Sequence, residues 1–332
     1  MTSVRDLELP EDPIAVRYRT PEEARRRAEN YHDQRERYRQ SGPTRARPRR
    51  AGRNDFVANQ DAVNEFLGRI LGAGAPGEDQ QFPGRLALLN PRTREVEVVG
   101  AARKGSIPLA WSPDHQRLLF TQPLLQSLQI YEYSRTDDTV RAVTHGPMAH
   151  AQACYGPEGR IVVAEVDTRE DPVRSRIAVS GPGGRAPFTM LTRGPTDHSP
   201  ACHPEGRGIA FVRETASPRT EIFFLDGIAD PTPRRLSPGR HPSFSHDGEW
   251  LAYAAPVKRE LRIWRMRPDG SGRAPIGRGL RHETRPAVSP DGRLVAYVAA
   301  EDRPRRHLYL RRFDGSGDRI LFADGDCEFP VW

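Results

Sequence analysis

The chain has little cysteine, almost no lysine and no long hydrophobic run. Three cysteines occur among 332 residues, and none of them has the short paired spacing typical of zinc sites. No apolar run approaches the ~20 residues that a membrane-spanning helix needs. The first residues lack the apolar stretch of a secretory signal, so the chain as it stands predicts a cytoplasmic protein with no membrane span. The absence of a Gly-x-Ser-x-Gly motif excludes the nucleophile elbow of an α/β-hydrolase.

One short phrase is repeated instead. It reads Ser-Pro-Asp-His, Gly-Pro-Glu-Gly, His-Pro-Glu-Gly, Ser-His-Asp-Gly and Ser-Pro-Asp-Gly, and its second positions are residues 113, 157, 204, 246 and 290. The steps between them are 44, 47, 42 and 44 residues. A period in the low forties, built from short apolar runs and turns, is typical of β-propeller blades.

The phrase itself predicts a tight turn. Proline presets φ at the second position, aspartate suits the third, and glycine adopts the strained conformation of the fourth. Apolar runs flank each turn, as in Ala287-Val288 before the last phrase and Leu294–Tyr297 after it. A second hairpin follows in each period, clearest at Leu308–Phe313. Two hairpins per period predict a four-stranded blade.

The two ends of the repeat region give the number of blades. The C-terminal run Phe329–Trp332 aligns with Arg285–Val288, so it begins a blade that the C-terminus does not finish. Residues 85–89 and 95–99 form a hairpin with no preceding phrase. Pairing this N-terminal hairpin with the C-terminal strand gives an all-β, six-bladed β-propeller over residues 84–332. A shared blade leaves no open sheet edge.

These repeats resemble those of a known family. Pro286–Tyr297, followed by Tyr309 and the turn Asp314–Gly317, is similar to the propeller repeats of the TolB family, the periplasmic component of the bacterial Tol–Pal envelope system. The repeats also resemble propellers of prolyl oligopeptidase-type peptidases, but the hydrolase domain is missing. The resemblance covers about three quarters of the chain and implies a propeller scaffold. It also implies a periplasmic location as the alternative to the cytoplasm.

The positions of two cysteines within the repeat indicate a structural role. Cys154 and Cys202 fall in the first strands of two different blades, where other blades carry large apolar residues. We therefore expect them to be small buried packing residues. An odd number of cysteines also fits a reducing compartment better than a disulfide scaffold.

The first 83 residues differ from the rest. Residues 1–53 form a polar, arginine-rich arm, in which Thr20-Pro21-Glu22-Glu23 predicts the start of a helix over 20–40. Residues 43–53 have the composition of a disordered segment. Residues 54–83 hold an amphipathic helix, 55–71, and a linker. We expect this helix to dock on the propeller rim, with a partner-binding helix as the alternative.

The positive charge is concentrated in the arm. Residues 35–53 contain eight arginines and one acid, which equals the net charge of +7 of the whole chain. Such a stretch can bind nucleic acid or an anionic surface by releasing counterions. It can equally be a solvated linker, and no aromatic residue after Tyr38 offers a stacking platform, so the sequence disfavours nucleic acid. The basic residues chosen as candidates are Arg45, Arg47, Arg49 and Arg50.

A second candidate site lies at the central channel. In a propeller the innermost strand of each blade lines the channel, and the residues just before these strands ring one mouth, at the boundary with solvent. The aligned positions are His150, His198, Arg240, His241, Glu283, Arg285 and Glu328. Three histidines at equivalent positions of different blades suit a metal site, but their spacings of 48 and 43 residues match no metal motif.

Three functions follow from these observations. The leading one is a non-catalytic protein–protein interaction module, which binds another protein through the channel mouth and the arm. The second is a metal-assisted lyase or hydrolase at the mouth. The third is a binder of nucleic acid or anionic surfaces through Arg35–Arg53. The sequence indicates no cofactor and no resident metal, and it leaves the oligomeric state open.

Overall fold

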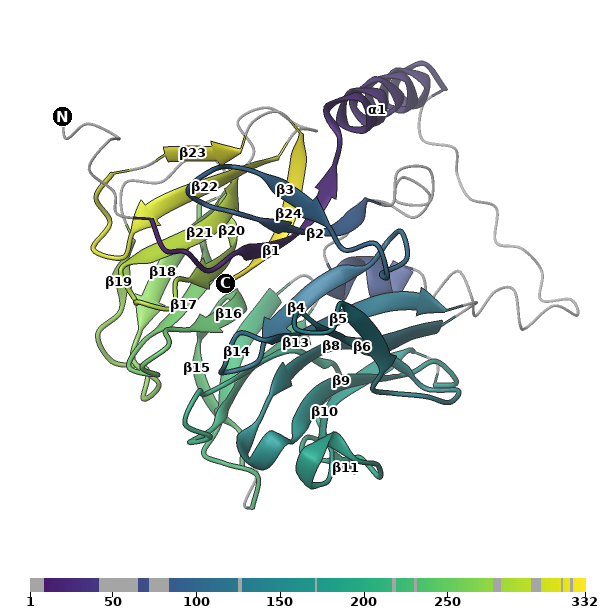
Figure 1. Cartoon of the computed structure of the whole chain (residues 1–332). Coiled ribbons are helices and arrows are strands. Elements are labelled where there is room, and N and C mark those ends of the chain that lie inside the picture. Colours follow the sequence, from purple (N-terminus) through teal and green to yellow (C-terminus); the bar gives the residue numbers. More distant parts are fainter. Residues whose placement is uncertain are drawn as a thin grey trace, which may run out of the picture.

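The computed structural model describes residues 9–41, 65–71 and 84–332, except for 125–126, 171, 217–218, 230–231, 259, 277–281, 300–305, 318 and 323–324. These residues form six four-stranded antiparallel sheets, arranged as the blades of a ring around a central channel (Figure 1). The six-bladed β-propeller predicted from the repeat is confirmed.

Five blades each consist of four strands that are consecutive in the sequence. Blade 1 is β4 (Ile107–Trp111), β5 (Arg117–Leu124), β6 (Ser127–Ser134) and β7 (Thr139–Ala142). Blade 2 is β8 (Ala149–Tyr155), β9 (Ile161–Asp167), β10 (Arg174–Val179) and β11 (Thr189–Met190). Blade 3 is β12 (Asp197–Cys202), β13 (Ile209–Ala216), β14 (Arg219–Leu225) and β15 (Arg234–Pro238). Blade 4 is β16 (Arg240–Phe244), β17 (Leu251–Val257), β18 (Glu260–Met266) and β19 (Ala274–Pro275). Blade 5 is β20 (Thr284–Val288), β21 (Leu294–Ala299), β22 (His307–Arg312) and β23 (Arg319–Phe322).

Blade 6 joins the two ends of the chain. Its strand order is β24 (Asp326–Val331), β1 (Ile14–Arg19), β2 (Arg85–Leu89) and β3 (Val96–Val98). The expected blade shared between the ends is therefore present, but the expected pairing of the hairpin with the C-terminal strand is wrong in one respect. Strand β1, from the segment assigned to the arm, lies between them and pairs with both.

The repeated phrase forms tight turns, as its residues predict. In the last phrase, the Gly292 N–H donates to the Ser289 carbonyl over 2.9 Å, and Gly292 has φ +70°. The Ser289 hydroxyl accepts from the Leu294 N–H (2.9 Å) and donates to Asp291 (2.5 Å). Ser245 bonds Trp250 N–H and Asp247 in the same way. Serine and aspartate thus close the hairpin before the second strand begins.

The innermost strands carry an irregularity that recurs at equivalent positions of four blades. A residue before a proline has a positive φ there, and the pairing register shifts at each site. These residues are Ser199 (φ +52°), His241 (+54°), Arg285 (+53°) and Phe329 (+56°). Non-glycine residues rarely adopt this conformation, and a bulge of this kind bends the strand and redirects a side chain.

The core consists of apolar layers between neighbouring blades. One layer packs Leu119 and Ile130 of blade 1 against Ala153, Val163 and Ala178 of blade 2. The layer between blades 5 and 6 contains Ile14, Val16, Leu294 and Leu310, together with the C-terminal Trp332. Strand β1 is therefore part of the core, since Ile14, Ala15 and Val16 are fully buried.

A covalent bond also joins two blades. The Sγ atoms of Cys154, in β8, and Cys202, in β12, form a disulfide, whereas Cys327 is a buried free thiol. The interpretation of Cys154 and Cys202 as unpaired packing residues is wrong. The two cysteines are not at equivalent positions of their blades, but adjacent innermost strands bring their Cα atoms within 5.7 Å, which suits a disulfide. The argument for a reducing compartment, which rested on unpaired thiols, has no support here.

The remaining described elements are helical. Helix α1 (Pro21–Ser41) begins where the sequence predicted it, with the Thr20 N–H donating to Glu23 and the Glu23 N–H donating to Thr20. Residues 65–71 are helical too. Two short 3-10 helices, Pro157–Gly159 and Pro182–Gly184, follow strands of blade 2. No described helix is long and apolar enough to cross a membrane.

Candidate functional site at the central channel

The seven candidate mouth residues all lie in or beside the first halves of innermost strands. His150 is in β8, His198 in β12, Arg240 and His241 in β16, Arg285 in β20, Glu328 in β24, and Glu283 directly precedes β20. They gather at one end of the channel, but not at the solvent boundary that we expected. Five are buried: His150, His198, Glu283, Arg285 and Glu328.

The short helix of residues 65–71 covers this end of the channel. Phe66, Leu67, Ile70 and Leu71 are buried. They form one apolar cluster with residues at the starts of three innermost strands, Ile107 in β4, Ala149 and Ala151 in β8, and Phe329 in β24. The expected apolar stripe is therefore used within the chain, and it packs over the channel rather than on the outer rim.

Polar side chains of the channel hold the C-terminal end of this helix. The Gln152 side-chain amide donates to the Ile70 carbonyl over 3.2 Å, and the Arg285 guanidinium donates to the Leu71 carbonyl. The last carbonyls of a helix have no partners within it, and a cation there also complements the helix dipole. On the exposed side, Arg69 forms an ion pair with Glu214 of β13, at 3.0 Å.

The bulged residues orient this network. The Ser199 N–H donates to the Gln152 side chain (2.7 Å), and Gln152 donates back to the Ser199 hydroxyl (3.0 Å). The Arg285 guanidinium also lies over the Phe329 ring, 3.7 Å from its centroid. Positive φ values at Ser199, Arg285 and Phe329 thus accompany contacts at the covered channel end.

Two histidines at this end are held in the neutral form. Burial, followed by the charges of Arg240 and Arg69, lowers the pKa of His198 to about 3. Burial, followed by the charges of Arg285 and Arg240, holds the pKa of His241 well below its usual value. Within the described part of the chain, His198 Nε2 and His241 Nδ1 are buried without a hydrogen-bond partner.

The carboxylates at this end are engaged by arginines. Glu328 is contacted by Arg17 and by Arg19 (2.8 Å), with Arg27 and Arg306 at 3.6 and 3.5 Å from its other oxygen. Burial alone would raise the pKa of Glu328, but these four arginines hold it well below its usual range. Arg27 also binds Asp326 at 3.0 Å, which anchors α1 to β24.

The other two candidates have partners in their own blade and in the preceding one. The Glu283 carboxylate accepts from Arg311 (2.9 Å) and from the Ile263 N–H (2.9 Å). His150 Nδ1 lies 3.2 Å from Gln129 Oε1, and its Nε2 lies 3.4 Å from Glu165. Among the residues that the structure describes, no three His, Cys, Asp or Glu side chains are grouped so as to hold a metal ion.

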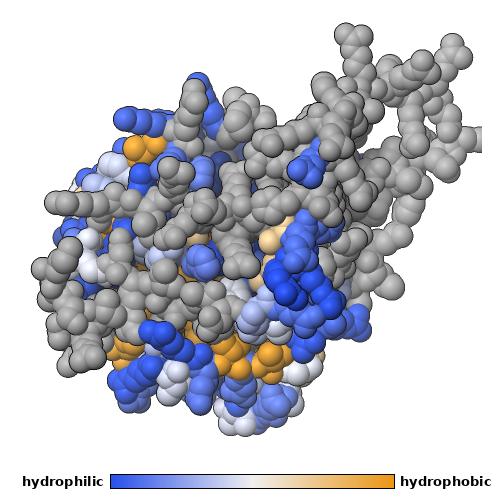
Figure 2. All heavy atoms as spheres, turned by 90° about the horizontal axis from the view of Figure 1, so that it is seen from above, coloured by the Kyte–Doolittle hydropathy of each residue, from blue (hydrophilic) through white to orange (hydrophobic). Residues whose placement is uncertain are grey.

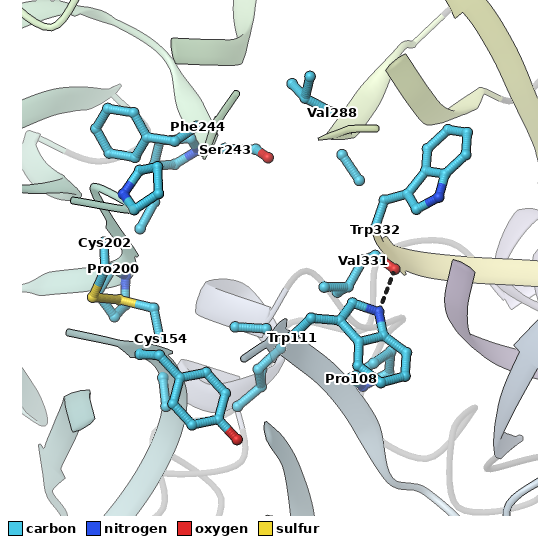
Figure 3. A pocket seen from close by; sticks show the side chains of 18 of the residues that line it. Pro108, Trp111, Cys154, Pro200, Cys202, Ser243, Phe244, Val288, Val331 and Trp332 are labelled. Atoms are coloured by element: carbon cyan, nitrogen blue, oxygen red, sulfur yellow. Dashed lines mark hydrogen bonds between the residues drawn. A yellow bond between two sulfur atoms is a disulfide. The ribbon is translucent and has the colours of Figure 1, made fainter. Parts of the chain in front are cut away.

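Beyond the covered end, the channel contains a cavity of about 290 Å³. It extends along the innermost strands of all six blades, from Arg285 and Phe329 to Trp111 and Trp332 near their far ends. Figure 3 shows prolines, Trp111, Phe244, Val288, Trp332 and the Cys154–Cys202 disulfide around it. A hydrogen bond from the Trp111 indole to the Val331 carbonyl (3.2 Å) joins blades 1 and 6 at its wall.

The outer surface contrasts with the cavity. On the face seen in Figure 2, hydrophilic side chains cover most of the described surface, and apolar residues appear only in small groups. The basic residues Arg45, Arg47, Arg49 and Arg50 lie outside the described residues. The channel is therefore a place where the described chain combines a cavity with unsatisfied polar atoms.

Sequence reasoning missed three features of this site. Strand β1, the source of Arg17 and Arg19, reads as part of a polar arm. The bulged residues precede a proline at a fixed distance from the repeated turn, as in Arg285-Pro286 and His241-Pro242, and this recurrence was a usable signal. The docking of residues 65–71 had a visible apolar stripe, but no pattern indicated the channel as its partner.

Fold and site define the chain as a six-bladed propeller of the TolB-like type, with a channel covered at one end by its own helix. No family model matches the chain. An uncharacterized protein of Agrobacterium fabrum (strain C58) is 24% identical over 267 residues, which cover 74% of this chain and 87% of that protein.

Solved structures share the architecture. TolB from Acinetobacter baumannii superposes with a TM-score of 0.63 at 17% identity, over 75% of this chain and 62% of that chain. A puromycin-hydrolysing peptidase of Mycobacterium tuberculosis gives a TM-score of 0.51 at 14% identity, over 73% of this chain and 43% of that chain. The chain thus spans less than two thirds of these structures, and at such identities the likeness shows the fold alone.

Proposed function

We propose that the protein is a non-catalytic interaction module, which holds a partner protein at the channel end formed by His150, His198, Arg240, His241, Glu283, Arg285 and Glu328. The TolB-like propeller fold supports an interaction scaffold in general terms. The observation that carries the finer proposal is the helix of residues 65–71. It occupies this end through an apolar face, and Gln152 and Arg285 hold its terminal carbonyls.

A partner that uses this end would present similar chemistry. An amphipathic helix with apolar residues spaced by three and four positions fits the cluster around Ile107, Ala149 and Phe329. Its C-terminal carbonyls would accept from Gln152 and Arg285. In this proposal residues 65–71 are displaced or joined by the partner, and the basic arm supplies a second contact.

The test compares baits that differ only at the channel end. Phe66→Asp with Ile70→Asp removes the internal helix from its apolar cluster, and His198→Ala, His241→Ala and Arg285→Ala together alter the end itself. A matched control replaces the exposed turn residues Glu158, Glu205 and Glu249 by alanine. These residues follow the opposite ends of the innermost strands.

Each bait is cross-linked in extract of the producing cells, and captured proteins are quantified by mass spectrometry. We expect one partner to be enriched on the helix variant, retained on the control and lost on the triple variant. Equal capture by all three folded baits would refute the proposal.

A further inference from the structure

The residues that line the channel cavity limit the chemical classes of ligand that it can bind. Among the described residues that line it there is no aspartate and no glutamate side chain. Its formally charged lining residue is Arg285, and its histidines are His115, His241 and His246. Most of the wall is apolar, with the aromatic rings of Trp111 and Trp332 among its members. A cavity of this kind has a cationic side chain at one end.

The cationic end has donors that are already buried. His241 is among the residues that line the cavity, and its Nδ1 is a buried atom without a hydrogen-bond partner among the described residues. Arg285 lines the same end and donates to the Leu71 carbonyl. Arg240 and Arg306 add positive potential there, since both disfavour a charge on His241. An unsatisfied buried polar atom is costly unless a ligand or water completes it.

The size of the cavity limits the ligand further. About 290 Å³ lies at the low end of the range of roughly 300–1,000 Å³ found for small-molecule sites. A molecule with one ring and a short chain fits such a space, whereas a folded segment of a protein does not. Proline and aromatic walls suit an apolar body, and guanidinium and imidazole groups suit a carboxylate.

We propose that the channel cavity binds a small monocarboxylate with an apolar body. The carboxylate lies at the covered end, where it accepts from the His241 ring and the Arg285 guanidinium. The body lies along the prolines of the innermost strands toward Trp111 and Trp332. This site differs from the proposed protein contact, because it is inside the channel and takes a ligand too small to displace residues 65–71.

The test uses three probes with the purified full chain. 3-Phenylpropionate carries both the ring and the carboxylate, 3-phenylpropanamide has the same ring without charge, and acetate has the charge without the ring. Binding is measured by isothermal titration calorimetry. The combined fluorescence of the four tryptophans, of which Trp111 and Trp332 line the cavity, is a second readout. We expect 3-phenylpropionate to bind at least tenfold more tightly than the amide, and acetate to show no binding at millimolar concentration.

Two variants and a control assign the effect to the covered end. Arg285→Gln keeps a donor for the Leu71 carbonyl but removes the charge. His241→Phe removes the ring nitrogens, and Phe329 at the equivalent position already adopts the same positive φ. Each variant should weaken the carboxylate at least tenfold and leave the amide unchanged. Arg193→Gln, an exposed arginine, should change neither.

Three outcomes would overturn the proposal. The acid and the amide could bind equally well to the natural chain, or none of the probes could bind at millimolar concentration. Alternatively, a folded His241→Phe variant could retain the full preference for the acid, which would place the carboxylate elsewhere even if Arg285→Gln failed to fold.

Discussion

Blade 6, which closes the ring, and the other blades pair their buried acids with arginines in different ways. Blades 3 and 5 each bury one acid beside one arginine, Asp197 with Arg213 and Glu283 with Arg311. Blade 6 instead surrounds Glu328 and Asp326 with four arginines from three parts of the chain: Arg17 and Arg19 of β1, Arg27 of α1, and Arg306 before β22.

The difference follows from how the blades are built. In blades 3 and 5 the strands follow one another in the sequence, and the acid and the arginine are only 16 and 28 residues apart. In blade 6, Arg17 and Glu328 are 311 residues apart. The cost of closing such a loop must be offset by specific contacts. A cluster of charges with several arginines supplies them and fixes the register of β1 on β24.

Removing β1 from blade 6 should have the largest effect on stability. Deleting residues 1–19 takes Ile14 and Val16 from the core, worth about 3–6 kcal/mol together, and leaves β24 and β2 as open edges. We expect loss of the cooperative thermal transition in circular dichroism. Deleting residues 1–8 is the control and should change the melting temperature little. An unaltered transition after the longer deletion would show that β1 does not close the ring.

Removing the central acid of the cluster should have the next largest effect. Glu328→Gln leaves several arginines buried without their charge partner, which costs about 3–5 kcal/mol. The measurement is urea unfolding of the variant and the natural chain at pH 7.

The same pair of proteins yields a test by pH. The folded-state pKa of Glu328 is depressed, so its stabilisation is present above the unfolded-state pKa of about 4.3 and is lost as the pH falls through the lower folded-state value. The difference in unfolding free energy between the natural chain and Glu328→Gln should therefore shrink below about pH 4. A constant difference from pH 7 to pH 3 contradicts the assignment.

The disulfide connects two regular blades, and its removal should cause a loss of stability of intermediate size. Cys154→Ala with Cys202→Ala opens a covalent loop of 48 residues, and such cross-links contribute about 2–4 kcal/mol. Chemical denaturation under non-reducing conditions measures the loss. Thiol labelling of the unfolded natural chain should modify Cys327 alone before reduction; labelling of all three cysteines would contradict the disulfide.

Replacing the buried acid of a regular blade should lower the unfolding free energy less than replacing Glu328 of blade 6. Glu283→Gln removes one charge from Arg311, which keeps the Ile276 carbonyl and the Tyr297 hydroxyl as partners. We expect a loss of about 1–3 kcal/mol in the same urea assay. A loss as large as that of Glu328→Gln would remove the distinction between the closing blade and the others.

The arm should be the least sensitive part. Replacing Arg45, Arg47, Arg49 and Arg50 together by serine should leave the melting temperature unchanged within error, because exposed charges contribute little to stability. Loss of cooperative melting in this variant would assign the arm a role in the fold.

The sequence predicts most of this architecture because the repeat is local. Each phrase specifies a turn through an acid at its third position, with proline before it in four phrases and glycine after it in four. The five phrases determine the period, and the two ends of the repeat region then give the number of blades. Strand β1 was missed because its pattern, Ile-Ala-Val-Arg-Tyr-Arg, is short, contains two arginines and is separated from β2 by 65 residues. The disulfide was missed because Cys154 and Cys202 occupy different positions of their repeats, and only the ring geometry makes them neighbours.

Alignment of the repeats places the candidate residues at the starts of the innermost strands, but it does not reveal their surroundings. It described a solvated mouth, whereas five of the seven residues are buried. Glu283 is buried with its partners Arg311 and Ile263, and the helix that packs at the channel end comes from outside the repeat. The bulges had a signal in the proline that follows each of them, but their φ values are defined only by the assembled strands.

The position of residues 65–71 in the chain has a consequence for any competitor. These residues belong to an insertion between β1 and β2, two adjacent strands of the ring, so the helix is tethered on both sides to the surface it covers. A tethered segment acts at an effective concentration that can reach the millimolar range. If the channel end is uncovered for one hundredth of the time, the apparent Kd of a partner rises about a hundredfold. A competing helix therefore binds only if its affinity and concentration are high enough to displace the tethered segment.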